Sequence, residues 1–447
     1  LNDSGPLIGQ PEAETATYDG AGACIAILDT GIDYTHADLG ASTNEGDFPN
    51  SKVVGGTDIV NNDAYPMDDE GHGTEVAGVA AGEGVLYRGV APGATLVALK
   101  VLNSTGTGWG SDVTAGIEWC ITNRATYNIK AINLSLSDYE EWSDPEGQCD
   151  NDVQAQAVAD AVSAGIVVVA AAGNLGYLDG IGYPACVSAA TAVGATYDRS
   201  YLSSLLYSDC TDASPPVNSI GCFSNRGELL DLYAPGALIT TAALGGGYVS
   251  GAGYAGTSYA APHVAGAVAV LVSMGVTTPA AIESLLARSG LQIVDPDTNV
   301  ATPRIDLVEA MDPPTTGPDL VVTALSGPTT VVVGDPVTVS LQVQNQGDTA
   351  SGPCTAIVVL SANRVASPRD PVMATVSVPA LAASQTFTDT SVAATIPLVM
   401  PGEHHLGAYA DSTYAIGEQD ETNNARLGDA VEVAGLTSRV VFNNIPA

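Results

Sequence analysis

The segment Cys24-Ile25-Ala26-Ile27-Leu28-Asp29-Thr30-Gly31 decides the fold, because an apolar run ends there at an aspartate and at a glycine that lets the chain turn. Similar runs recur at 95–99, 131–134 and 166–170. Runs that are apolar on both faces are typical of buried parallel strands. Helix-like segments, such as 113–124 and 153–164, lie between them. This alternation predicts an α/β domain over residues 1–310, with a parallel central sheet flanked by helices.

The composition changes at residues 311–318, Met-Asp-Pro-Pro-Thr-Thr-Gly-Pro, which we interpret as a linker. From Val337 to Gln344 apolar and polar residues alternate, which indicates a half-buried antiparallel strand. Further strand-like runs separated by turn residues follow. They predict an all-β, immunoglobulin-like sandwich over 319–434, and the last residues, 435–447, form a C-terminal tail.

The chain of 447 residues is strongly acidic, with 50 acidic and 13 basic residues and a net charge of −37. Nucleic acid and anionic membranes are poor partners for such a surface, since phosphate contacts need clustered Lys and Arg. No apolar run is long enough to cross a bilayer, so we expect no membrane insertion. The charge fits a soluble, self-repelling monomer, and it equally fits adaptation to high salt, where counterions screen the carboxylates.

The seven cysteines form no CxxC pair, which argues against a zinc ribbon or a thioredoxin-like site. They indicate structural disulfides in an oxidising compartment. Cys210 and Cys222 bracket a short loop and are natural partners, while the odd count leaves at least one free thiol, for which Cys354 is the candidate. The N-terminus lacks the basic and apolar parts of a secretory signal, so we expect Leu1 to begin a processed, secreted chain.

Three polar residues stand at the ends of apolar elements. Asp29 follows a buried strand, and ligands bind at the carboxyl ends of parallel strands. His72 lies between two glycines at a helix start, which leaves its imidazole unhindered. Ser258 opens a helix beside Gly256, where backbone N–H groups face developing negative charge. Taken singly, each has an ordinary explanation as a turn aspartate, a structural histidine or an N-cap serine.

Taken together, the order Asp, His, Ser is one of the known orders of orienting carboxylate, general base and nucleophile. The segments 26–33, 71–78 and 256–266 resemble the subtilase family of serine proteases, over about residues 1–310. Cys24, five residues before Asp29, resembles the proteinase K branch. The resemblance implies an extracellular serine endopeptidase with the subtilisin-like fold, working through an acyl-enzyme intermediate.

The resemblance also assigns roles. It implies that Asp29 orients the base His72 and that Ser258 is the nucleophile. Asn174, at the end of the segment 170–174, resembles the oxyanion-hole asparagine, which acts with the backbone N–H of Ser258. Two other classes of protein fit the sequence less well. An adhesion protein with an inactive protease domain is disfavoured by the intact set of four residues, and a sedolisin-type carboxyl peptidase would carry glutamate where His72 stands.

By the same resemblance, a peptide or protein substrate lies as an added strand between two edges, formed by Gly106, Thr107 and Gly108 and by Ser135, Leu136 and Ser137. The family usually has glycine at position 137, so the serine either narrows the groove or adds a hydrogen bond. The P1 pocket is expected to be walled by Leu136, Ala171, Ala172 and Gly173. These apolar walls imply broad cleavage after apolar or aromatic residues.

A structural calcium ion is implied by the resemblance, with Asp231 and carbonyls near Ser188 and Ala190 as ligands. It also suggests the pairs Cys24–Cys120 and Cys149–Cys186, and a pro-segment that assists folding. Tyr259 stands where the family commonly has methionine, and a phenol resists the oxidation that converts methionine to its sulfoxide. We therefore expect tolerance to peroxide.

The remaining polar residues of interest receive structural interpretations. His263 is expected to pack inside the same helix as Ser258, and Asp33 and His36 are expected in a solvated loop. Residues from Asp319 to about Val433 resemble CARDB-type β-sandwich modules. In their acidic segment 417–424 we favour a solvated turn over a calcium site. The module binds substrate, binds the cell surface or braces the catalytic domain, and the sequence leaves these roles open.

Overall fold

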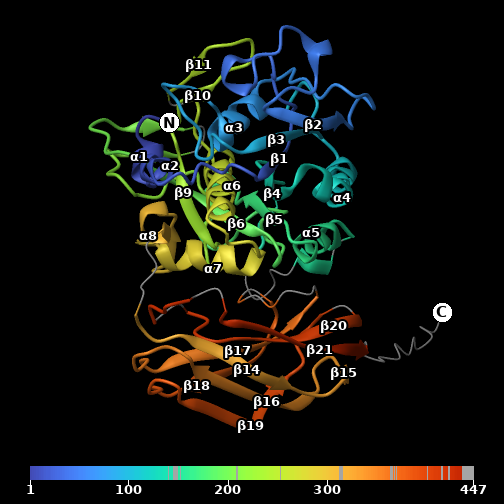
Figure 1. The fold of residues 1–447 in the computed structure, drawn as a ribbon, viewed down its shortest axis with the longest axis vertical. Helices are drawn as coiled ribbons and strands as arrows, with labels where there is room; N and C mark the ends of the chain where they lie inside the picture. Colours follow the sequence, from blue (N-terminus) through green and yellow to red (C-terminus); the bar gives the residue numbers. More distant parts are fainter. Residues whose placement is uncertain are drawn as a thin grey trace, which may run out of the picture. The chain divides into compact units, whose positions relative to one another are not determined.

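The computed structural model describes residues 1–447 apart from 139, 144–148, 152, 208–209, 252, 312–315, 363–365, 367, 369, 400, 414–415, 421–422 and 435–447. The predicted C-terminal tail and residues 312–315 of the predicted linker lie outside the described residues. The chain divides into two compact units, formed mainly by Leu1–Thr315 and by Thr316–Gln419 with Asn423–Ala447 (Figure 1).

The first unit is built on a nine-stranded sheet within the described residues. From edge to edge its strands are β12 (Leu291–Val294), β13 (Ala301–Arg304), β9 (Leu232–Ala237), β6 (Thr191–Tyr197), β5 (Val167–Ala171), β4 (Ile129–Leu134), β1 (Cys24–Asp29), β3 (Thr95–Lys100) and β2 (Val53–Asp58). All neighbouring pairs are parallel except β12 with β13. The predicted parallel central sheet is confirmed.

Helices, 3-10 turns and short strands complete this unit. The helices are α1 (Ser4–Leu7), α2 (Gln10–Thr15), α3 (His72–Ala81), α4 (Gly110–Tyr127), α5 (Val153–Ser163), α6 (Thr257–Ser273), α7 (Pro279–Ser289) and α8 (Leu307–Met311), with 3-10 turns η1 (Ala37–Leu39), η2 (Glu45–Asp47) and η3 (Cys149–Asn151). Two hairpins pair β7 (Leu205–Leu206) with β8 (Thr211–Asp212) and β10 (Thr241–Ala242) with β11 (Tyr248–Val249).

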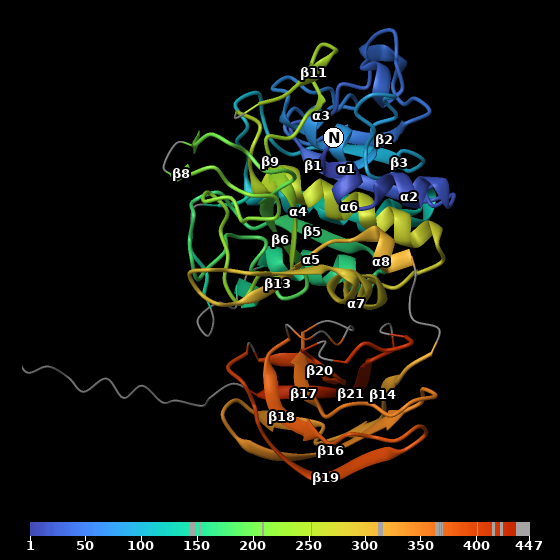
Figure 2. The ribbon, with the colours of Figure 1, turned by 90° about the vertical axis from the view of Figure 1, so that its left-hand side faces the viewer.

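Helices cover both faces of the sheet, as buried parallel strands require. Strand β1 shows the division, because Ile25 and Ile27 join a core cluster with residues of α3 and α6. Leu28, on the opposite face, approaches α4, where a Cβ added to Gly116 would lie 2.9 Å from Leu28 Cδ2. Figure 2 shows α6 running through the middle of the first unit.

Helix α6 is buried along most of its length and consists mainly of alanine, valine and glycine. These small side chains let it lie close to α3. A Cβ at Gly266 would fall 2.6 Å from Val90 Cβ and 2.8 Å from the carbonyl oxygen of Ala80 in α3. Because His72 is the first residue of α3 and Ser258 the second residue of α6, this close packing bears directly on the candidate active site.

The second unit contains two sheets around one apolar core. One has the order β14 (Leu320–Ser326), β16 (Pro336–Asn345), β19 (Thr386–Thr395), and the other the order β15 (Thr330–Val332), β21 (Ala425–Ala434), β20 (Gly402–Tyr409), β17 (Cys354–Ser361), β18 (Val372–Val378). All pairs are antiparallel except β15 with β21. The strand predicted from alternation is β16, with Val339, Leu341 and Val343 buried. The predicted all-β sandwich is confirmed as an antiparallel β domain with two sheets.

The disulfides correct one predicted pairing. Cys149–Cys186 and Cys210–Cys222 are bonded as expected, and Cys354 is a free, buried thiol. Cys24 and Cys120, however, are also free and buried, so the pair suggested by the resemblance to proteinase K is wrong for this structure. Burial raises the pKa of the Cys24 thiol to about 12 and that of Cys120 well above its usual value, so both are protonated and unreactive.

Two expectations of solvated positions are also wrong. Asp33 and His36 are each 3% exposed. Asp33 accepts hydrogen bonds from the amides of Thr35 and Gly245, and His36 Nε2 lies 2.8 Å from the carbonyl oxygen of Gly247, so both bind a distant loop. Local sequence could not show this, because the partner loop lies more than two hundred residues away.

In the acidic segment 417–424, of which 421–422 lie outside the described residues, Glu418 is buried, which corrects the expectation of a solvated turn at this residue. Its carboxylate accepts hydrogen bonds from the amide of Leu320 and the side chain of Asn424. The expectation for His263 is confirmed, since it is buried within α6 and contacts the carbonyl of Tyr259. Among the described residues, no helix combines the length and apolarity that a bilayer crossing requires.

Candidate active site

The end of β1 and the start of α3 bring Asp29 and His72 together. Asp29 is fully buried, and its two carboxylate oxygens lie 2.9 and 3.0 Å from Nδ1 of His72. The amide of Thr30 donates a further hydrogen bond of 2.7 Å to Asp29 Oδ1. With Nδ1 committed to the carboxylate, Nε2 is the nitrogen of His72 that remains for proton transfer.

The surroundings of His72 favour its protonated form. Burial by itself would lower the pKa of the imidazole, but the neighbouring Asp29 carboxylate, with smaller effects of Glu75 and Glu70, raises the pKa to about 9. A histidine acts as a general base only when neutral. The free enzyme should therefore need alkaline conditions for full activity.

Two polar side chains hold the backbone of Ser258 in place. Ser135 Oγ donates a hydrogen bond of 2.7 Å to the carbonyl oxygen of Ser258, and the side chain of Asn133 donates in turn to Ser135 Oγ at 2.8 Å. Ser258 and His72 line the same cleft, together with Asn174. Three segments far apart in the sequence therefore present an aspartate–histidine pair and a serine to one space.

The oxygen of the Asn174 side chain is fixed by the residue before the serine. Asn174 Oδ1 accepts hydrogen bonds from the amide and the hydroxyl of Thr257, at 2.8 and 3.0 Å. Its NH₂ group is therefore the part that can donate into the cleft. A Cβ placed on Gly256 would lie 2.9 Å from Ser258 Oγ and 3.2 Å from Asn174 Nδ2, so both groups flank this glycine. The Asn174 NH₂ group and the Ser258 hydroxyl therefore lie close together beside Gly256.

Asp68 is a central residue that the sequence analysis missed. It is 4% exposed. Oδ1 accepts from the Thr30 hydroxyl at 2.8 Å and from the Glu70 and Gly71 amides, and Oδ2 accepts from the amide and hydroxyl of Thr74. It therefore joins the residue after Asp29 to the first turn of the helix that begins with His72. The only local signal was an aspartate shortly before the glycine–histidine motif.

Lys100 supports the same region from the neighbouring strand. Its ammonium group is buried and donates to the carbonyl oxygens of Thr30 and Leu102, at 2.6 and 2.9 Å, and to Asp69 at 2.6 Å. Leu102 is a wall residue of the cleft. Lys100 thus fixes both the turn after Asp29 and one edge of the substrate cleft.

The predicted substrate edges lie on the cleft, which has a volume of about 1250 Å³. Its lining includes both predicted edges, Gly106, Thr107, Gly108, Ser135, Leu136 and Ser137. The other predicted wall residues, Ala171, Ala172 and Gly173, are buried behind it and do not line it.

Ser137 lines the cleft, and its hydroxyl donates a hydrogen bond of 3.1 Å to the carbonyl oxygen of Asp138. A Cβ on Gly182 would lie 2.0 Å from Ser137 Oγ, and one on Gly173 would lie 3.1 Å from it. The serine hydroxyl thus occupies the space that the two glycines leave between them. The hydroxyl therefore both takes up space beside the two glycines and forms a hydrogen bond, so the contacts agree with each of the two alternatives stated for this position.

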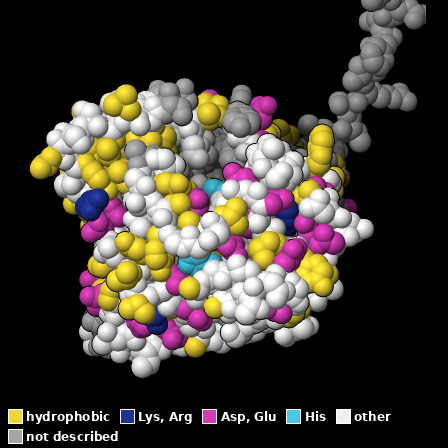
Figure 3. All heavy atoms as spheres, turned by 90° about the horizontal axis from the view of Figure 1, so that it is seen from above, with side chains coloured by type: hydrophobic (Ala, Val, Ile, Leu, Met, Phe, Trp, Pro, Cys, Tyr) yellow, Lys and Arg dark blue, Asp and Glu magenta, His cyan; other side chains and the backbone are white. Residues whose placement is uncertain are grey.

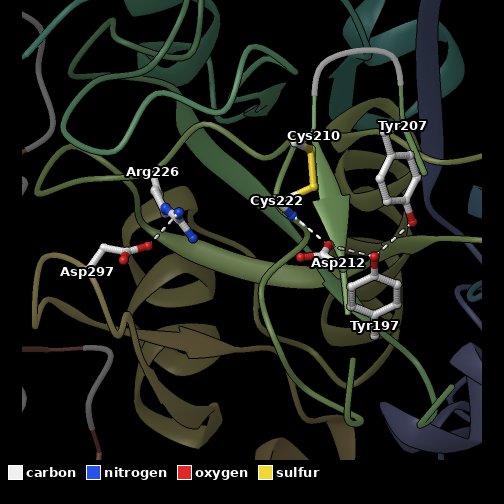
Figure 4. The surroundings of a disulfide bond; sticks show 7 residues. All are labelled: Tyr197, Tyr207, Cys210, Asp212, Cys222, Arg226 and Asp297. Atoms are coloured by element: carbon white, nitrogen blue, oxygen red, sulfur yellow. Dashed lines mark hydrogen bonds and ion pairs between the residues drawn. A yellow bond between two sulfur atoms is a disulfide. The ribbon is translucent and has the colours of Figure 1, made fainter. Parts of the chain in front are cut away.

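A second hollow, of about 560 Å³, shares Asn174 with the cleft and is walled by the Cys210–Cys222 disulfide. Figure 4 shows the residues that support this wall. Asp212 Oδ2 accepts from the Tyr197 hydroxyl at 2.7 Å and from the Cys222 amide at 2.9 Å, and the hydroxyls of Tyr197 and Tyr207 lie 2.9 Å apart. The hollow therefore adjoins the cleft at Asn174, and hydrogen bonds hold its wall in place.

The predicted calcium ligand Asp231 is engaged in a protein contact. Its Oδ2 accepts a hydrogen bond of 2.7 Å from the amide of Ala192. Near the expected carbonyls, the amide of Ser188 donates to Asp150. The described part of the chain gathers no group of three or more His, Cys, Asp or Glu side chains suited to a metal. A calcium ion at Asp231 would thus depend mainly on backbone carbonyl oxygens, which are suitable hard ligands.

A largely parallel sheet with helices on both faces and an aspartate, a histidine and a serine gathered at one cleft defines a serine peptidase of the subtilisin fold. Comparison with known proteins agrees. Residues 20–307 match the Subtilase family and residues 317–427 match CARDB. The chain belongs to the subtilase family and carries a C-terminal CARDB domain.

Similar curated proteins are subtilisins and thermitase. The chain is 38% identical to Subtilisin DY of Bacillus licheniformis over 60% of this chain and 83% of that protein, and 38% identical to Subtilisin E of Bacillus subtilis (strain 168) over 59% and 58%. Thermitase of Thermoactinomyces vulgaris is 37% identical over 58% and 77%. The crystal structure of a cold adapted subtilisin-like serine proteinase matches with a TM-score of 0.50 and 29% identity, covering 64% of this chain and 89% of that one.

The position of Gly256 gives a test of the site geometry. Gly256→Ala adds a methyl group between Ser258 Oγ and Asn174 Nδ2, at a backbone conformation that alanine can adopt. We expect kcat to fall about 100-fold, the usual cost of moving a reacting group by about 1 Å. The melting temperature should change little. Gly417→Ala is the matched control, since its Cβ would meet nothing within 4 Å. Full activity of the Gly256 variant would contradict the assigned geometry.

Proposed function

We propose that this subtilisin-like serine endopeptidase hydrolyses proteins and peptides outside the cell, with Ser258 as nucleophile, His72 as general base and Asp29 as the orienting carboxylate. The observation that supports this assignment best is the bidentate contact between His72 Nδ1 and the buried Asp29 carboxylate, at 2.9 and 3.0 Å, in the cleft that Ser258 lines.

The proposed reaction follows from these positions. Ser258 Oγ attacks the scissile carbonyl carbon while His72 Nε2 takes its proton. The negative charge on the carbonyl oxygen is stabilised by Asn174 Nδ2 and the Ser258 amide. When the C–N bond breaks, His72 returns the proton to the leaving amine, and an acyl-enzyme remains. Water then attacks the ester by the same sequence of proton transfers, which releases the acid and restores Ser258.

The decisive variant is Ser258→Ala. Without the hydroxyl no acyl-enzyme forms, and we expect casein hydrolysis to fall by a factor of about 10⁶, as when the nucleophile of a subtilisin is removed. The fold should persist, because the serine side chain is not part of the core. Circular dichroism and the melting temperature serve as controls. Casein cleavage at the parent rate by the folded variant would refute the assignment.

For substrate choice, we propose cleavage after apolar residues, in a groove that Ser137 narrows. The apolar walls that support this are Leu136, Leu102 and Val113, while the acidic residues that line the cleft are Glu70 and Asp138. The expected order for chromogenic peptides is apolar P1 above Arg and Glu. Ser137→Gly should raise kcat/KM for Phe relative to Ala by about tenfold, the scale of one added group in an apolar pocket. A strong preference for Arg would contradict the proposal and would show that an acidic residue of the cleft governs substrate choice instead.

We also propose that the protein binds one structural calcium ion, with Asp231 among the ligands, as the family resemblance implies. Its removal should lower stability, because a ligand bound only to the folded state stabilises it. In the inactive Ser258→Ala protein, EDTA should lower the melting temperature by about 5 °C or more. Asp231→Asn should remove most of this effect. Equal melting curves with EDTA and with calcium-saturated EDTA would contradict the site.

We further propose secretion, a monomeric state, a pro-segment during folding, peroxide tolerance through Tyr259 and adaptation to high salt. The acidic surface supports the last point: Lys52 and Lys100 are each 1% exposed, so two of the three lysines do not reach solvent. Figure 3 shows acidic side chains spread over one face with few basic ones between them. The two disulfides support an oxidising compartment. Adhesion by an inactive domain is not favoured, because the site residues are intact.

A further inference from the structure

Glu75, an acidic residue of α3, forms a contact near Asp29 and His72 that has no part in the proposed mechanism. Glu75 follows His72 by three positions in α3, so both side chains lie on the same side of the helix. Its Oε2 accepts a hydrogen bond of 2.5 Å from the hydroxyl of Tyr259, the residue after the nucleophile. One hydrogen bond therefore links the helix of the base to the helix of the nucleophile.

The Tyr259 ring also contacts His72. The two rings meet edge to face, with centroids 6.1 Å apart and an interplanar angle of 64°. Tyr259 is 5% exposed and packs with Val79 and Ile239. Because the ring is fixed by this packing, its hydroxyl holds the Glu75 carboxylate in one place beside the imidazole.

We propose that Glu75, fixed by Tyr259, is a positioning residue that sets the pH range in which His72 is a neutral base. This inference rests on the proposed catalytic role of His72. An ionised carboxylate near the imidazole stabilises its protonated form, so a higher pH is needed to generate the base. Removing the charge should make the base available at lower pH.

Other ionisable groups lie around His72, Glu75 and Tyr259. Those that act electrostatically on His72, Glu75 or Tyr259 are Asp29 at the end of β1, Asp68 and Glu70 before α3, and Tyr254 before α6. Glu70 Oε2 accepts from the His72 amide. Asp29 remains the dominant partner, because it contacts Nδ1 directly. Glu75 differs from all of them in being fixed by the residue next to the nucleophile.

The protonation of Glu75 itself is coupled to the same contact. Burial raises the pKa of Glu75, while the Tyr259 hydrogen bond and His72 lower it. Loss of the Tyr259 hydroxyl would therefore favour the neutral acid and weaken the field at His72. Glu75→Gln and Tyr259→Phe are therefore expected to shift the pH profile in the same direction, because both reduce the negative charge beside the imidazole.

The test is the pH dependence of kcat/KM for an uncharged chromogenic peptide, from pH 5 to 10 at fixed ionic strength. For Glu75→Gln we expect activity at pH 7, relative to the alkaline plateau, to rise about 3- to 10-fold, because tenfold corresponds to one pH unit of displacement. Tyr259→Phe should move the profile in the same direction by a smaller amount. Glu118→Gln, at an exposed position on α4, makes the same chemical change as the control and should leave the profile unchanged.

Two results would overturn the inference. One is a Glu75→Gln profile that coincides with that of the Glu118 control. The other is a fall in activity or melting temperature at every pH without displacement of the profile, which would mean that the contact only joins two helices. Should a variant be too unstable for kinetics, NMR titration of the His72 imidazole in the Ser258→Ala background gives the same answer. Failure of Ser258→Ala to abolish activity would instead refute the proposed function.

Discussion

The buried contact between Asp29 and His72 is the constraint on which the rest of the active site depends. Removing a carboxylate from water costs on the order of several kcal/mol unless hydrogen bonds and an opposite charge compensate. The Thr30 amide and the imidazole supply that compensation here. Asp68 and Lys100 then hold the turn after Asp29 in position, through the Thr30 hydroxyl and carbonyl. Many of the polar contacts at this edge of the sheet therefore stabilise the buried carboxylate of Asp29 or the turn that follows it.

A second requirement is that two helices approach closely enough for the serine to share a cleft with the histidine. Helix α6 allows this close approach because its residues are small. Any side chain in place of Gly266 would clash with Val90 and with α3. The apolar helix is stable in this position because it is covered by the sheet and by α3. Thr257, the residue before Ser258, then fixes the side chain of Asn174.

Several further contacts lie around this centre. Ser137 fills a gap between two glycines, and the Cys210–Cys222 disulfide walls the hollow beyond Asn174. Glu75 and Tyr259 form a hydrogen bond next to the base. Each of these features leaves the reacting groups in place while changing the shape or charge beside them. Variation at the edge of a fixed centre is how one fold acquires different substrate and pH ranges.

The sequence by itself determined the parallel sheet, the second β domain and the likeness to the subtilase family, and it singled out Asp29, His72, Asn174 and Ser258 as the candidate site residues. Apolar periodicity reports local burial, and the three motifs lie within short segments, so both can be recognised without coordinates. Only the tertiary structure decided that Cys24 and Cys120 are free, that Asp33 and His36 are buried, and that Asp68 joins the catalytic segments. These properties depend on contacts between residues far apart in the chain, and such contacts leave no local pattern.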